Sequence, residues 1–269
     1  MVNRIIGFDF LRALCMLYIV AFWHVGNYVG NLLLCAPTQI LMFCALGAFV
    51  FMSGFLLAQK YAAGDIWKFW KKRVLRIYPL YAFALVLFFS IGLISSRLYF
   101  LAALFLLNAP LNIPITTLWF ISMIFAFYLL MPVVWKLPVI TLILFIFVCI
   151  ILRSRIDEDL IIYFPCFVCG VISGKNKNLR IVIPKYLSLI VPKSASMLTI
   201  ILKISNASFC MYLFHRVVYW GLLKLYTPHS KVLIVIYLLA LGVPLTYYLS
   251  ATTQEYYDRH LEKPIQQSN

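Results

Sequence analysis

The first apolar stretch of the chain carries ionisable residues at depths where a membrane helix normally has none. Residues 4–28 read RIIGFDFLRALCMLYIVAFWHVGNY, and about 20 apolar residues suffice for a helix to cross a bilayer. Within the stretch stand Asp9, Arg12 and His24. Ionisable groups at such depth are costly, and they usually face a bundle interior or a wet path where they have a role. The stretch therefore predicts a transmembrane helix with one functional face.

Helical spacing predicts how these side chains are arranged. At about 100° per residue, Asp9 and Asn27 point in one direction, with Arg12 and His24 about 60° to either side. At a rise of about 1.5 Å per residue, His24 lies about 18 Å from Arg12. We therefore expect the two to mark two depths of one cavity. The alternative is structural: an Arg–Asp pair in the core and a histidine hydrogen-bonded to a neighbouring helix.

Composition extends the membrane interpretation to the whole chain. Of its 269 residues, 64% are hydrophobic and 12% are charged, whereas a soluble domain is nearer half apolar and a quarter charged. The sequence predicts an all-α fold, a polytopic bundle of transmembrane helices. No cleaved signal peptide is recognisable, so the first span is expected to stay as a signal anchor. The net charge of +15 lies in short loops between spans, as the positive-inside rule expects, and does not indicate nucleic acid.

Hydropathy predicts eight strong spans, and two weaker segments would raise the count to ten. Both counts place the two termini on one side, and the strongly basic segment 60–76 makes that side cytoplasmic. Residues 175–203 are expected either to cross once or to lie on the membrane surface. The domain prediction is one transmembrane domain over residues 1–250 and a polar tail over 251–269. The strong spans are residues 4–28, 39–59, 79–94, 118–135, 139–152, 160–172, 205–225 and 231–250, and the weaker segments are 98–107 and 186–203.

A second candidate site is the basic sequence KKRVLRIYP at residues 71–79. Arg73 and Arg76 are three residues apart, so on a helix they share a face. Paired guanidinium groups suit phosphate recognition through forked hydrogen bonds. The alternative is ordinary anchoring to anionic lipid head groups. Combined with the buried His24, the pair favours a phosphorylated donor such as acyl-CoA, with the imidazole accepting the proton of a hydroxyl that attacks the thioester.

Other patterns are expected to be structural. Cys166 and Cys169 have CxxC spacing, but the apolar segment offers no further ligands, so we assign neither a metal nor a redox role. Ser53 and Gly54 lie among small residues of the second span, which let helices approach closely in lipid. A packing role is preferred there to a pocket role.

The order of motifs resembles the acyltransferase 3 family. The chain shows DFLR…H, then FMSGF, RxxRxxYPLY, LWFISMIFAFYLLMP and MYLFH, between Arg4 and Trp220. Members of this family are integral-membrane enzymes that transfer acetyl or other acyl groups to sugars and surface polysaccharides. The resemblance implies that His24 is the essential catalytic group, as general base, with Arg12 from the same span, and that Arg73 and Arg76 hold acyl-CoA. It carries the family's other motif residues over to Trp119, Tyr128, Pro132, Tyr212 and His215.

Two departures from the family pattern affect these assignments. The family usually has ten residues between the first arginine and the histidine, and this chain has eleven, Ala13 to Trp23. One extra residue rotates His24 by about 100° unless a π-bulge absorbs it. Many members also carry a carboxylate where this chain has Ile124, Phe125 and Ala126, so no second catalytic carboxylate is assigned.

The function expected from the sequence is acyl transfer to a hydroxyl of a sugar, polysaccharide or lipid-linked glycan. Asp9 and Arg12 are expected to order the cavity around His24. Trp119, Tyr128 and His215 are assigned to substrate, and His215 is about as well explained by packing. Acyl-CoA is a co-substrate, no resident cofactor or metal is expected, and the location is a cell membrane, a bacterial inner membrane. The alternatives are a transporter or flippase of an amphiphile and a non-catalytic membrane protein that retains the fold.

Overall fold

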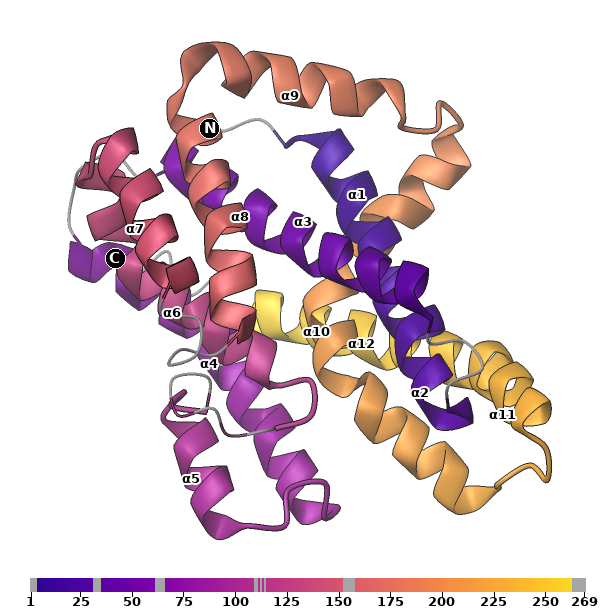
Figure 1. The fold of residues 1–269 in the computed structure, drawn as a ribbon. Coiled ribbons are helices and arrows are strands. Elements are labelled where there is room, and N and C mark those ends of the chain that lie inside the picture. The colour runs from indigo at the N-terminus through magenta and orange to yellow at the C-terminus, as the bar shows by residue number, and fades with distance from the viewer. Residues whose placement is uncertain are drawn as a thin grey trace. The chain divides into compact units, whose positions relative to one another are not determined.

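The chain folds into helices, several of them long enough to cross a membrane (Figure 1). The computed structural model describes residues 4–30, 35–60, 66–108, 111, 113, 115–151 and 158–262. Every regular element in these ranges is a helix, which confirms the predicted all-α transmembrane fold. By length and composition, six helices in the same ranges can span a membrane: Ile6–Val29, Ala36–Gln59, Ile66–Ser90, Trp119–Lys136, Ala195–Leu225 and Lys231–His260.

These helices belong to two compact units. One unit comprises Met1–Arg4 with Gly47–Tyr186, and the other comprises Ile5–Leu46 with Leu187–Asn269. The predicted single transmembrane domain over residues 1–250 stays a prediction, and the two units are described separately.

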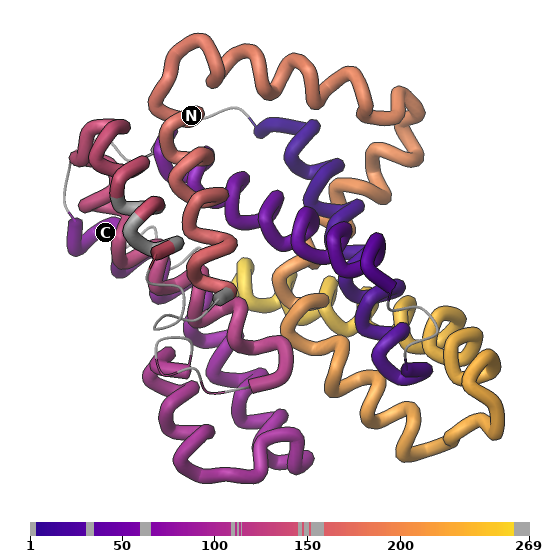
Figure 2. Tube along the Cα trace, viewed as in Figure 1, coloured from indigo at the N-terminus to yellow at the C-terminus, as the bar shows by residue number. Residues whose placement is uncertain are grey.

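In the unit that contains the first span, three helical stretches succeed one another from Ile6 to Val29. The span ends at Gly30, whose φ of 74° is a conformation that glycine adopts without steric cost. The first span packs against α10, and α12 packs on α10 as well; α10 is orange and α12 yellow in Figure 2. The elements are α1 (Ile6–Leu17), η1 (Tyr18–His24), α2 (Val25–Val29), α10 (Ala195–Leu225), α11 (Lys231–Tyr237), η2 (Leu238–Gly242), α12 (Val243–Tyr257) and η3 (Asp258–Glu262).

Contacts within this unit fix the directions of its helices. Asp9 meets Ser205 and, further along both helices, His24 meets Arg216, so the first span and α10 run parallel. Cys210 meets Gln254, whereas Leu222 meets Tyr237; the last span therefore runs antiparallel to α10. Consequently the first span begins, and the last span ends, at the same end of this unit. Helical structure also continues beyond the predicted end of the last span at residue 250, to Glu262.

In the other unit, glycines bring two helices into backbone contact. A Cβ atom at Gly54 would overlap the carbonyl oxygen of Phe167, and one at Gly170 would overlap that of Phe51. Small residues permit such close approach in lipid, which confirms the packing role predicted for Gly54. The helices that contribute residues to this unit are α3 (Ala36–Lys60), α4 (Ile66–Ser90), α5 (Arg97–Leu104), α6 (Trp119–Lys136), α7 (Val139–Ile151), α8 (Glu158–Lys175) and α9 (Lys177–Leu189).

α8 packs on α6, and contacts near both ends of the pair give their relative direction. The rings of Trp119 and Tyr163 lie 6.3 Å apart at the beginnings of the two helices. At their ends, Lys175 Nζ donates a 2.7 Å hydrogen bond to the carbonyl of Trp135. These two contacts show that α8 runs parallel to α6 from Tyr163 to Lys175, and α7 connects the two helices along the chain.

The structure offers no support for the two additional spans of the ten-span alternative. α5 has only 8 residues, too few to cross a bilayer. The segment 186–203 is interrupted at residues 190–194, between α9 and α10. α9 has 13 residues, none of them buried, and it carries Lys177, Arg180 and Lys185. This amphipathic character favours a helix lying on the membrane surface.

The third span begins earlier than predicted. α4 starts at Ile66 and passes through Pro79 without a break. Membrane helices tolerate proline because neighbouring groups satisfy the freed backbone carbonyl. Taking Pro79 as the start was therefore wrong, and the basic residues from Lys68 to Arg76 lie on the first turns of a helix rather than in a loop.

Candidate active site

A π-helix begins after Arg12 and ends at His24. It covers Tyr18–His24, and a π-helical turn accommodates one extra residue without rotating the helix beyond it. On a regular α-helix the two side chains would point about 120° apart, and absorbing one residue reduces this to about 20°. The extra residue between Arg12 and His24 is thus absorbed by a π-bulge, the one arrangement in which the unusual spacing does not turn His24 away.

The same bulge overturns one prediction. Asn27 is exposed, whereas Asp9 and His24 are both 5% exposed. Asn27 therefore does not share the direction of Asp9, because the π-helix shifts every later residue of the span. Its place toward α10 is taken by Tyr28, whose ring lies 5.7 Å from the guanidinium carbon of Arg216.

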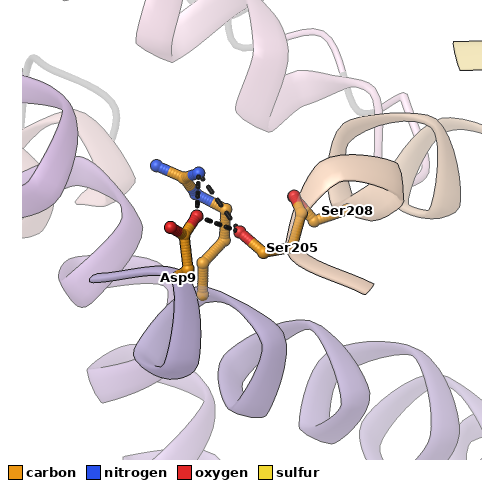
Figure 3. Close-up of polar contacts among 4 residues, drawn as sticks. Asp9, Ser205 and Ser208 are labelled. Carbon is orange, nitrogen blue, oxygen red and sulfur yellow. Dashed lines mark hydrogen bonds and ion pairs between the residues drawn. The ribbon is translucent and has the colours of Figure 1, made fainter. Parts of the chain in front are cut away.

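Near the beginning of the first span, Asp9 and Arg12 form a polar cluster with Ser205 of α10 (Figure 3). The Ser205 hydroxyl donates to Asp9 Oδ1 over 2.7 Å. Arg12 Nη1 lies 3.6 Å from the same carboxylate oxygen and 3.4 Å from the Ser205 hydroxyl. A buried carboxylate must be paired or hydrogen-bonded to be stable, and this cluster provides both. It ties the first helix to α10.

Near the other end of the span, His24 lies among groups from α10. Its imidazole stacks on that of His215 with ring centroids 4.5 Å apart and planes inclined by 29°. Arg216 Nη2 lies 3.0 Å from His24 Nδ1. His24 Nε2 is buried and has no hydrogen-bond partner among the described residues. The predicted catalytic imidazole is therefore buried. Its Nδ1 contacts Arg216, and its Nε2 has no hydrogen-bond partner among the described residues.

His215 is fully buried, at 0% exposure. Its Nδ1 lies 3.1 Å from the carbonyl oxygen of Met211 and 2.9 Å from that of Tyr212. Its Nε2 is also without a partner in the described part of the chain. The neighbouring Tyr219 donates through its hydroxyl to the carbonyl of Val20 in the π-helix. The widened turn of the first span and the end of α10 are thus joined at the histidine pair.

The two clusters are separate. His24 is fifteen positions after Asp9, which is about 22 Å along a helix. Asp9 and Arg12 therefore do not contact His24, as expected for two depths of one helix. The structure brings His24 and His215 together, although the sequence assigned His24 to catalysis and His215 to substrate.

The two arginines of the RxxR pair have different environments in α4. Arg73 is half-buried, with its guanidinium carbon 5.7 Å from the Phe69 ring centre and 6.0 Å from that of Tyr128. Arg76 is exposed. The two side chains thus lie near the same end of α4, but Arg73 is half-buried against two aromatic rings and Arg76 is exposed to solvent.

The predicted residues of α6 lie in different surroundings along one unbroken helix. Tyr128 donates to the Ser53 hydroxyl over 3.2 Å and faces Arg73, whereas Trp119 packs on Tyr163. Pro132 is buried within the helix. Trp119 and Tyr128 therefore contact different neighbours.

Sequence reasoning did not find Arg216, Ser205 or Tyr219. Each contacts the first span from about 200 positions away in the chain, a proximity that no local pattern contains. Arg216 nevertheless left a signal. A charged residue in the middle of an apolar helix is rare and usually functional, and this one directly succeeds the MYLFH motif.

Fold and site together define a polytopic membrane protein with a buried pair of imidazoles beside a guanidinium. A family model described as acyltransferase domain, that of the acyltransferase 3 family, matches residues 5–157. The match covers more than half of the chain, which therefore belongs to this family. Tyr212 and His215 lie beyond the matched residues. Comparison with curated proteins and with solved structures gave no match.

Proposed function

We propose that this membrane acyltransferase transfers an acetyl or other acyl group from acyl-CoA to a hydroxyl of a sugar, polysaccharide or lipid-linked glycan. The observation that supports this most directly is the histidine pair. Two stacked imidazoles, each with a buried Nε2 that has no partner among the described residues, lie in a chain of an acyltransferase family. Imidazole accepts and returns a proton near neutral pH, as acyl transfer to a hydroxyl requires.

The donor is proposed to bind through Arg73 and Arg76. Guanidinium groups hold phosphates with forked hydrogen bonds, and exposed Lys71 and Lys72 stand beside them. Stacking on Phe69 and Tyr128 orients the Arg73 guanidinium. In this proposal acyl-CoA is a co-substrate, no resident cofactor or metal takes part, and Trp119 and Tyr128 contact the substrates.

We further propose that donor and acceptor approach from opposite sides. The basic start of α4 makes that end cytoplasmic by the positive-inside rule, and both termini then lie in the cytoplasm. His24 stands eighteen residues beyond Ile6 but only five before Val29, so it lies nearer the extracytoplasmic end of the first span. This arrangement suits decoration of an extracytoplasmic glycan at the membrane of a bacterial cell.

The decisive experiment is the His24→Ala variant. Purified protein is incubated with radiolabelled acetyl-CoA and with octyl glucoside as a sugar hydroxyl probe, and labelled ester is counted. The variant is expected to lose about 100- to 10,000-fold in rate, the usual cost of removing a side chain that transfers a proton or holds the oxyanion, while inserting into membranes normally. His229→Ala, at an exposed loop position, is the matched control. Equal rates for His24→Ala and the wild type would remove the catalytic role.

A further inference from the structure

The two imidazoles of the histidine pair meet hydrogen-bonding partners of opposite kinds. His24 Nδ1 lies 3.0 Å from Arg216 Nη2. A guanidinium can only donate hydrogen bonds, so His24 Nδ1 must accept. In that ring Nδ1 holds no proton, and the proton of the imidazole is therefore on Nε2.

His215 is held in the other way. Its Nδ1 lies 3.1 Å and 2.9 Å from two backbone carbonyl oxygens of α10, those of Met211 and Tyr212. Carbonyl oxygens only accept, so His215 Nδ1 must donate. In the neutral ring the lone pair is then on Nε2.

The pair consequently offers one donor and one acceptor from adjacent rings. The ring centroids are 4.5 Å apart, and each Nε2 is buried without a partner among the described residues. Leaving a buried polar atom unpaired is unfavourable, and a pair serving only to fill space would not require polar rings. Two such atoms of complementary kind are suited to a reacting group that both donates and accepts.

Resting on the proposed acyl transfer, we propose a division of roles between the two histidines. His215 is the proton acceptor, and His24 is a neutral hydrogen-bond donor to the carbonyl oxygen of the acyl group. Arg216 is a positioning residue that keeps His24 in the required tautomer. A neutral imidazole can polarise a carbonyl in this way, and a fixed donor stabilises the developing oxyanion.

The transfer step conserves atoms and electrons. The acceptor hydroxyl gives its proton to His215 Nε2 while its oxygen forms a bond to the thioester carbon. The negative charge on the carbonyl oxygen is held by the His24 Nε2–H. The carbon–sulfur bond then breaks, the electron pair leaves with the CoA sulfur, and the proton passes from His215 to the thiolate. An ester and a free thiol are the products.

The first test compares glutamine substitutions, measured as CoA release with acetyl-CoA and octyl glucoside. Glutamine places an N–H close to the position of Nε2 but cannot act as a base. His215→Gln is therefore expected to lose about 100- to 10,000-fold, whereas His24→Gln retains most of the rate that His24→Ala loses. His229→Gln is the control. A His24→Gln variant as slow as His24→Ala, together with a His215→Gln variant at the wild-type rate, would overturn the assignment.

The second test does not depend on activity. In protein with ¹⁵N-labelled histidine, the nitrogen chemical shifts show which ring atom carries the proton, and single substitutions assign each signal. We expect His24 to be protonated on Nε2 and His215 on Nδ1. Arg216→Ala should change the His24 signals and lower the transfer rate, and Arg216→Lys, which also only donates, should restore both. The reversed tautomers would overturn the proposal, whereas a wild type that releases no CoA would refute only the acyl-transfer function.

Discussion

Individual arginines of this chain illustrate how strongly the surroundings decide a role. Arg12 pairs with a carboxylate, Arg216 holds an imidazole and Arg73 stacks on aromatic rings, whereas Arg76 is exposed at the start of the same helix as Arg73. Of these four arginines, Arg76 alone is both exposed and next to exposed lysines at the start of α4. It is therefore the best residue for testing the donor site.

We expect Arg76→Ala to weaken donor binding. A hydrogen bond to a charged group contributes about 1.5–3 kcal/mol, so the KM for acetyl-CoA should rise about 10- to 100-fold while kcat changes little. Arg180→Ala is the matched control, since Arg180 is also an exposed arginine but lies on α9, away in the chain from the basic start of α4. The measurement is the transfer rate over a range of acetyl-CoA concentrations. Equal KM values for the two variants would show that no forked phosphate contact exists there.

The sequence identified those candidate residues that are unusual for their immediate neighbourhood in the chain. Asp9, Arg12 and His24 stand out because an apolar helix contains them, and the extra residue before His24 left two outcomes open, a rotated histidine or a π-bulge. Arg216 and His215 acquire their roles through contact with a helix about 190 positions earlier. Long-range contacts depend on packing, and one sequence does not contain that information. The tautomers, which decide the proposed chemistry, depend on those contacts.

At the scale of elements, the π-helix Tyr18–His24 sets the direction of the first span's second half. Deleting Ala21, a half-buried residue inside it, should convert the π-helix to a regular α-helix and leave His24 facing Arg216. Transfer should therefore persist in that variant. Inserting one alanine after Ala21 should instead turn His24 by about 100° and cost at least about 100-fold in rate, as misplaced catalytic groups do. The measurement is the acyl-transfer rate of the deletion variant and of the insertion variant. Loss of activity in the deletion variant would contradict this role of the π-helix.

A second element-scale prediction concerns the contact of α3 with α8. Gly170→Ala places a methyl group against the backbone of Phe51, and overpacking of this kind costs about 1–3 kcal/mol. The free energy of unfolding in mixed detergent micelles should fall by that amount. Gly221→Ala in α10 is the control, because no atom lies within 4 Å of its added Cβ; it should gain about 0.5–1 kcal/mol from helix propensity. Similar stabilities for both variants would argue against backbone contact between the helices.

For the whole molecule, hydropathy predicted eight to ten crossings and left the number open. By length and composition, six helices in the described residues can span a membrane, and the two weaker segments fall on the 8-residue α5 and on the break between α9 and α10. Helix directions place the beginning of the first span and the end of the last span at one end of their unit. An even number of crossings places both termini on one side of the membrane. Which side this is remains a prediction from the basic residues alone.

Cys35 can test that orientation, because it lies in the short connection between the first two spans and is exposed. Hydrogen bonds from the backbone and hydroxyl of Thr38 lower the pKa of the Cys35 thiol below its usual value, so its reactive thiolate forms at lower pH than that of an ordinary cysteine. In a variant that keeps only Cys35, a membrane-impermeant maleimide should label intact cells, with half-maximal rate at a lower pH than in the same variant carrying Thr38→Val. Lys72→Cys, with Cys35 replaced, should react only after the cells are opened. Labelling of Cys35 restricted to opened cells would reverse the topology and place both termini outside.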